Sequence, residues 1–128
     1  MTAYVLPFPV SVNHYYRHVG TRALISKDGR KYREAVWATV METGRVKHDG
    51  RLSVEVMLYP PDHRRRDIDN CFKGLLDALQ HAGVYEDDGQ IDYLSVRRGE
   101  RSAGGQCVVT ITVLPMPAPA RWALDNCS

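Results

Sequence analysis

Apolar and polar residues alternate in several stretches of this chain with the period of two that is typical of strands. The clearest stretch is residues 51–59, RLSVEVMLY, in which one side is apolar and the other carries Ser53 and Glu55. This pattern predicts a half-buried strand, which the two following prolines end. Residues 91–98 and 106–113 predict two more strands, joined as a hairpin through GERSAGG.

The N-terminal quarter of the chain is less regular. Residues 4–10, YVLPFPV, predict an edge strand or a strand end, because prolines cannot donate to a sheet ladder. Residues 12–22, VNHYYRHVGTR, are polar and aromatic. They predict a loop that leads into the short apolar segment ALIS.

Two longer segments have helical spacing instead. Ser26 can serve as the N-cap of a helix that continues to Gly44. The apolar residues of that helix are Tyr32, Val36, Trp37, Val40 and Met41. A second amphipathic helix begins near residue 67 and ends at Gly83, a residue type that often follows helix C-termini. Its apolar face is predicted to consist of Ile68, Phe72, Leu75, Leu76 and Leu79.

The elements therefore follow in the order β-α-β-α-β-β. A chain of 128 residues is long enough for one domain with a modest core. We predict the α+β class, with a single mixed sheet and two main helices against it. The domain is expected to cover residues 1–114. Residues 115–128 begin with three prolines in five residues and predict a tail, or an arm that docks through Trp122 and Leu124.

Composition narrows the class of protein without identifying it. No apolar run approaches the roughly 20 residues that a membrane span needs, and the first ten residues lack the features of a signal peptide. The three cysteines, Cys71, Cys107 and Cys127, have no spacing typical of metal sites. We therefore expect a cytoplasmic protein with no membrane partner, no zinc and no disulfide.

The net charge of +2 conceals a strong separation of charge along the chain. Residues 1–66 hold 12 basic and 6 acidic residues. Residues 67–92 hold one basic and seven acidic residues, and residues 93–128 hold four basic and two acidic residues. A basic surface beside a compact acidic cluster fits an enzyme that attracts a polyanion and cuts it with bound cations. A chance mixture of solvated faces is the other interpretation of these charges.

The basic and acidic regions meet in HRRRDIDNCFKGLLDAL, residues 63–79. Asp67 can occupy the N-cap of the predicted helix while Asp69 lies in its first turn, so that both carboxylates can reach one point. Two converging carboxylates repel unless a cation lies between them, and hard oxygen ligands favour Mg²⁺ or Mn²⁺. Alternatively, Asp67 only caps the helix and Asp69 only improves its dipole.

Lys73 lies one helical turn after Asp69, on the same face. It can hold an attacking water or stabilise charge on a phosphate, or it can form only a weak surface pair with Asp69. The preceding arginines can bind the phosphates of a nucleic-acid strand, with a solvated basic face as the alternative. These are Arg64, Arg65 and Arg66.

A second acidic cluster, Glu86, Asp87 and Asp88, would complete such a site if it approached Asp69. The helix from Asp69 to Gly83 covers about 20 Å, and the segment from Gly83 to Asp88 reaches at most about 17 Å. A return within one chain is barely feasible, so contribution across a dimer interface is a serious alternative. An exposed acidic turn is a third interpretation.

Together, RRRDIDNCFKGLLDALQHAGVYEDDGQIDY (64–93) and LPFPVSVNHYYRH (6–18) resemble the RusA family of Holliday junction resolvases. These are small endonucleases often carried by phages and prophages. The shared pattern is an arginine-rich start, D-x-D-N, a lysine four residues later, D-A-L, and A-G followed by D-D-x-Q. The resemblance spans residues 3–113. The double proline near the family's start is here Pro9 followed by Val10, and the tail has no counterpart.

The resemblance implies an intertwined homodimer of mixed α/β fold that requires Mg²⁺ or Mn²⁺. Such a dimer cuts two opposed strands of a four-way DNA junction symmetrically. It also implies that Asp67, Asp69 and Asp88 are catalytic and bind the metal, with Lys73 as the catalytic lysine. Asp87 is expected to be a bystander.

The expected function is therefore a structure-specific endodeoxyribonuclease that resolves Holliday junctions, without a small-molecule cofactor. Tyr15 and Tyr16 either stack on unpaired bases or pack in the core. Two alternatives remain, a non-catalytic junction-binding protein and a nuclease acting on other branched DNA. The residues expected to contact DNA are Asn13, Tyr16, Arg17, Arg64, Arg65 and Arg66.

Overall fold

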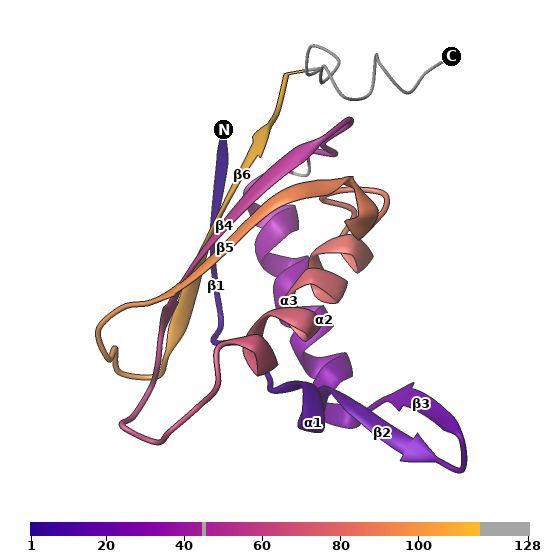
Figure 1. Ribbon diagram of the computed structural model, residues 1–128, viewed down its shortest axis with the longest axis vertical. Coiled ribbons are helices and arrows are strands. Elements are labelled where there is room, and N and C mark those ends of the chain that lie inside the picture. The colour runs from indigo at the N-terminus through magenta and orange to yellow at the C-terminus, as the bar shows by residue number, and fades with distance from the viewer. Residues whose placement is uncertain (45, 116–128) are drawn as a thin grey trace, which may run out of the picture.

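The computed structural model describes residues 1–44 and 46–115, which form a sheet with helices on one face and a projecting hairpin (Figure 1). The elements in chain order are β1 (Thr2–Leu6), α1 (Val12–Tyr15), β2 (Tyr16–Val19), β3 (Arg22–Ile25), α2 (Lys27–Glu42), β4 (Leu52–Tyr59), α3 (Asp69–His81), the 3₁₀ turn η1 (Asp88–Gln90), β5 (Ile91–Arg98) and β6 (Gln106–Val113).

The main sheet has the strand order β1-β6-β4-β5. Strand β6 is antiparallel to both β1 and β4, whereas β5 is parallel to β4. The predicted α+β class with a mixed sheet is therefore confirmed. The predicted single sheet and the order β-α-β-α-β-β are wrong, because β2 and β3 add a separate two-stranded sheet between α1 and α2. Helices α2 and α3 lie on the same face of this sheet (Figure 1). Because α3 connects two parallel strands, it runs antiparallel to both of them.

The predicted hairpin between β5 and β6 is wrong, because β4 lies between these strands. The side chains of β4 that face the helices, Leu52, Val54, Val56 and Leu58, are at most 2% exposed. A strand this buried needs a hydrogen-bonded partner on each edge. The connection 99–105 must span two strand spacings, about 10 Å, which seven residues reach easily. A short connection therefore does not oblige the strands that it joins to pair.

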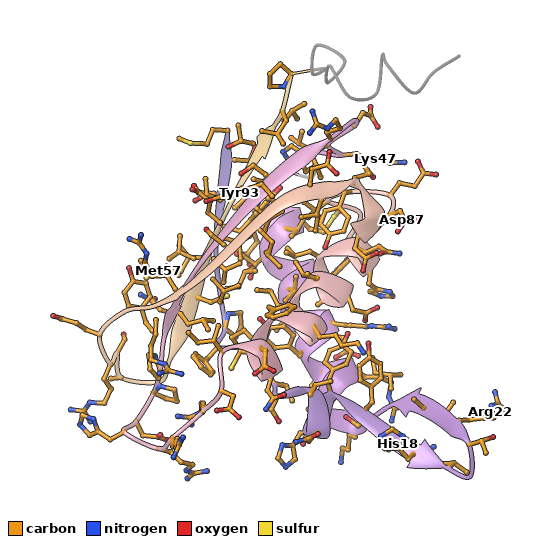
Figure 2. The ribbon with its side chains drawn as sticks, viewed as in Figure 1. His18, Arg22, Lys47, Met57, Asp87 and Tyr93 are labelled. Carbon is orange, nitrogen blue, oxygen red and sulfur yellow. The ribbon has the colours of Figure 1, made fainter. Side chains whose placement is uncertain are left out.

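The segment 12–22, predicted to be a loop, is instead regular. It forms α1 and most of the β2–β3 hairpin, in which Tyr16 pairs with Ile25 and Gly20 turns the chain at φ 62°. The side chains near the turn are exposed, and Figure 2 shows Arg22 at the far end of the hairpin, away from the helices. The hairpin was missed because it buries no alternating apolar stripe.

The predicted helix starts and ends are partly confirmed. Ser26 caps α2, because its Oγ accepts a hydrogen bond from Gly29 N at 2.9 Å. The helix continues to Glu42, just before the predicted end at Gly44. Gly83, at φ 81°, follows α3 and turns the chain out of the helix as predicted.

The buried face of α3 differs in part from the prediction. Leu75 and Leu79 are fully buried as predicted, but Ile68, Phe72 and Leu76 are only half-buried. Small residues of the helix take the remaining core positions. At 100° per residue, positions 72 and 76 lie on the flank of α3 opposite the one that faces α2. This flank borders β5 (Figure 1).

The predicted tail falls almost entirely at residues 116–128, outside the described residues, so the boundary at 114 stays a prediction. Within the described residues, none of the helices combines the length and the apolar character that crossing a bilayer requires.

Candidate nucleic-acid cleft and carboxylate site

The two aspartates of the D-x-D pair have exposed side chains at the start of α3. The sequence predicted Asp67 as the N-cap of this helix, and that prediction is wrong. Ile68 holds the N-cap position, with helical backbone angles. The backbone oxygen of Asp67 accepts a hydrogen bond from Asn70 N at 3.2 Å, and no side chain caps the helix. The carboxylates of Asp67 and Asp69 therefore remain available to a ligand.

Asp67 lines a cleft of about 870 Å³. The walls come from the segment after β1, from α1 and α2, from the loop before α3 and from the first turn of α3. The cleft brings together four of the six residues predicted to bind DNA, which are Asn13, Arg64, Arg65 and Arg66. Beside them lie Asp67 and the amide of Asn70, which was not predicted to take part. Groups that can hold phosphates thus lie beside a free carboxylate.

Arg66 is fixed in this loop by hydrogen bonds to Asp62 and to the backbone oxygen of Arg64, and by an aromatic contact. Its Nη1 and Nη2 donate to the Asp62 carboxylate at 2.7 and 3.2 Å, and its guanidinium lies 5.4 Å from the centre of the Phe8 ring. The hydrogen bonds from Arg66 and from the backbone of Arg64 lower the pKa of Asp62 to about 2. Within the described residues no carboxylate pairs with Arg64 or Arg65, so their charge is available to a polyanion.

Lys73 is exposed on α3, and its Nζ lies 5.9 Å from the centre of the Tyr16 ring. In the part of the chain that the structure describes, Lys73 forms no ion pair with Asp69. Tyr16 is half-buried and meets the Tyr15 ring edge to face, with the centroids 4.8 Å apart. The ammonium group therefore rests near an aromatic ring and keeps its hydrogen-bond donors free.

Tyr15 belongs to the core, so base stacking by this residue is wrong. Its side chain is fully buried, its hydroxyl donates to the Asp77 carboxylate, and burial together with this bond raises the pKa of Tyr15. Arg33 of α2 donates to the same carboxylate oxygen at 2.7 Å. This network joins α1, α2 and α3, and no prediction from the sequence included it. Its one local signal was Asp77, a turn after Lys73 on a polar flank.

The Tyr15 ring lies so close to α3 that only glycine fits at position 74. A Cβ added at Gly74 would lie 2.7 Å from Tyr15 Cδ2. In an exposed helix a glycine-to-alanine change raises stability by about 1 kcal/mol. Here the new methyl group would displace Tyr15 and disturb its bond to Asp77. We expect Gly74→Ala to lower the free energy of unfolding by about 1–3 kcal/mol, measured by urea denaturation. Unchanged stability would contradict this close packing.

Asp88 lies at the opposite end of α3 from the D-x-D pair. Its backbone N–H donates to Gln80 Oε1 at 3.1 Å, and Gln80 follows Asp69 by about 16 Å along the helix. Among the described residues of one chain, no three His, Cys, Asp or Glu side chains form a metal-binding cluster. The length of the chain left open whether Asp88 folds back to Asp67 and Asp69 of the same chain. In this structure it does not.

The two neighbouring aspartates of this turn have different contacts. Asp87 caps η1, because its Oδ1 accepts a hydrogen bond from Gly89 N at 3.0 Å, which lowers the pKa of Asp87. Desolvation, followed by the interaction with Asp87, raises the pKa of Asp88. Figure 2 shows Asp87 at the end of the helix layer away from the β2–β3 hairpin. Asp87 thus has a structural contact, whereas the carboxylate of Asp88 interacts mainly with its neighbour.

Two of the predicted DNA contacts, Tyr16 and Arg17, lie on β2 and do not line the cleft. Arg17 is exposed. The β2–β3 hairpin that carries it projects from the body beside α1 (Figure 1).

Comparison with known proteins agrees with the resemblance seen in the sequence. The family model described as Endodeoxyribonuclease RusA matches residues 7–113. A crossover junction endodeoxyribonuclease rusA of Enterobacteria phage HK97 is 44% identical over 115 residues, covering 87% of this chain and 93% of the relative. The proteins so named in Escherichia coli (strain K12) and Enterobacteria phage 82 are 37% and 38% identical over 109 residues, covering 84% of this chain and 90% of each relative.

Proposed function

Because this chain belongs to the RusA family of endodeoxyribonucleases, we propose that it resolves four-way DNA junctions by cutting two opposed strands symmetrically. The relatives are named crossover junction endodeoxyribonucleases, and this chain covers most of their length. The observation that carries the proposal is the cleft in which Asp67 lies beside three arginines. Its basic walls would hold backbone phosphates, and the adjacent carboxylates would direct hydrolysis to one of them.

The exposed carboxylates at the start of α3 suit a hard divalent cation. Mg²⁺ commonly binds through one or two carboxylates, with water and phosphate oxygens completing its shell. We propose Mg²⁺, replaceable by Mn²⁺, held by Asp67, Asp69 and Asp88. Such an ion, when bound, supplies a water of lowered pKa and offsets charge on the leaving oxygen.

The remaining steps are assigned to groups of the chain itself. Lys73 lies one turn along α3 from Asp69, and its free ammonium would offset the negative charge that builds on the phosphate. Arg64 and Arg65 would hold the strand by its backbone without reading its sequence. Asn13, Tyr16 and Arg17 are proposed as further DNA contacts from α1 and the β2–β3 hairpin.

We propose that a second copy of the chain supplies the third carboxylate. Arg98 at the end of β5 donates to the backbone oxygen of Arg66, whereas Asp88 lies just before β5. The molecular edge formed by α3 and β5 thus has Asp67 and Asp69 at one end and Asp88 at the other. A two-fold axis across the middle of this edge would exchange its ends, so that the Asp88 of each copy would meet the D-x-D pair of the other.

Three features of the α3–β5 edge support this dimer. Within the described residues β5 pairs only with β4, so its other edge is free to bind a partner. The two ends of β5 carry opposite charge, because Glu86–Asp88 precede the strand and Arg98, on the helix side of the sheet, ends it, so an antiparallel partner sets acid against base. The flanking apolar side chains are only half-buried, and they are Phe72, Leu76, Leu94 and Val96.

The proposed activity is tested with purified protein, Mg²⁺ and three labelled substrates: a four-way junction, a linear duplex of the same sequence and a flapped duplex. We expect paired nicks at symmetrical positions in the junction, little cutting of the duplex, and no cutting once EDTA is added. Equal cutting of junction and flap would replace junction resolution with a broader activity on branched DNA. Junction binding without cutting, under any divalent cation, would favour a non-catalytic junction-binding protein.

A further inference from the structure

A second cavity borders the loop that carries the three arginines. It has a volume of about 300 Å³ and shares Phe8, Cys71 and Arg64–Arg66 with the cleft. Its other walls come from the end of β4 and from the β5–β6 turn. Its further charged residues are Asp62, His63, Arg98 and Arg101. We call this cavity the arginine pocket.

The charges in the arginine pocket do not balance. Five arginines face one carboxylate, Asp62, and that carboxylate is already bonded to Arg66. Within the described residues, none of the other four arginines has an ion pair. Guanidinium groups held near one another repel, and an anion placed between them would remove that cost. The pocket therefore has the electrostatic character of an anion site.

Backbone contacts hold the pocket in shape. Gly99 N donates to Leu58 O at 2.7 Å, and Ser102 N donates to Pro60 O at 2.9 Å. Arg98 also donates to the backbone oxygen of Arg66. The β5–β6 turn is thereby tied to the loop before α3, so the arginines converge from two segments that are more than 30 residues apart in the chain.

We propose that the arginine pocket binds a second backbone phosphate of the DNA strand whose neighbouring phosphate lies beside Asp67. Arg64–Arg66 form the wall shared by the cleft and the pocket, so a strand leaving the cleft passes directly into the pocket. Guanidinium forks match phosphate oxygens in geometry and in charge. The inference rests on the proposed function for its ligand, and it makes Arg98 and Arg101 DNA-binding residues.

Arg101→Gln tests the pocket, and Arg97→Gln is its matched control. Arg97 pairs with Met57 whereas Arg98 pairs with the buried Leu58, so Arg97 lies on the opposite face of the sheet from the pocket. Junction affinity is measured by fluorescence anisotropy without Mg²⁺ at several salt concentrations. We expect Arg101→Gln to weaken binding about tenfold and to reduce the slope of log Kd against log salt by about 0.9. Arg97→Gln should change neither.

Arg101→Lys separates charge from folding, because it should retain most of the affinity and the full salt slope. Equal Kd values and slopes for Arg101→Gln and the wild-type chain would overturn the inference. It would also be overturned if inorganic phosphate raised the Tm of the wild-type chain but not of Arg101→Gln while both bound the junction equally, because the pocket would then be an anion site outside the DNA path. These readouts need no cutting, so a wild-type chain that binds junctions without cutting them would overturn only the proposed function.

Discussion

The Asp69→Asn variant should bind a four-way junction at least as tightly as the wild-type chain and leave it uncut. Asparagine keeps the size of the side chain but removes the charged oxygen that a hard cation requires. We expect the single-turnover rate of cutting with Mg²⁺ to fall by about 10³-fold or more. Binding should not weaken, because the change removes a negative charge from a surface that faces phosphates. Anisotropy without Mg²⁺ measures the affinity.

Asp49→Asn is the control for this loss of charge. Asp49 is exposed in the connection between α2 and β4, outside the lining of the cleft, so its variant should cut at the wild-type rate. A rate for Asp69→Asn within tenfold of the wild-type rate would remove Asp69 from the proposed metal site. Loss of junction binding by Asp69→Asn would instead assign this carboxylate a structural role at the start of α3.

A heterodimer of one Asp69→Asn chain and one Asp88→Asn chain should nick junctions although each variant alone is inactive. If the Asp88 of one copy completes the site of the other, this heterodimer combines both changes in one site and leaves the second site intact. If each site were built within one chain, both sites would be defective. Two affinity tags on co-expressed chains allow the heterodimer to be purified. The expected product is a single nick, because only one of the two sites can cut.

The control for this experiment pairs an Asp69→Asn chain with an Asp67→Asn chain. Both changes lie at the same end of α3, so each of the two sites would contain one of them, and no cutting is expected. An inactive Asp69→Asn and Asp88→Asn heterodimer that still binds junctions would exclude the proposed exchange of Asp88. A chain that remains monomeric in sedimentation at the concentrations used for cutting would exclude the dimer.

The parts of the fold that were predicted correctly depend on residues close together in the chain. The cap at Ser26, the alternation along β4 and the end of α3 at Gly83 each involve interactions within a few residues. The D-x-D pair at the start of a helix and Lys73 one turn later are also features of neighbouring residues. The predicted N-cap of α3 was wrong by one residue, because several residues near a helix start can satisfy the first free N–H groups.

The errors concern contacts between distant segments. The short turn after β5 suggested a hairpin with β6, but burial of β4 places that strand between them. The β2–β3 hairpin carries no apolar alternation, so the sequence pattern predicts a loop there. Arg98 and Arg101 were assigned no role, because only the packing of the β5–β6 turn on the loop before α3 brings them to the other arginines.

The amino-acid sequence by itself determined the helices and strands of the core, the amphipathic start of α3 and the chemical groups of the proposed metal site. These follow from periodicity, capping and charge over short stretches, whose energies do not depend on the rest of the fold. Only the tertiary structure decided that β5 joins the sheet beside β4, that Asp88 lies one helix length from Asp69, and that five arginines share a pocket. Those outcomes depend on which distant segments bury one another's surfaces and pair their backbones, and no local pattern encodes that choice.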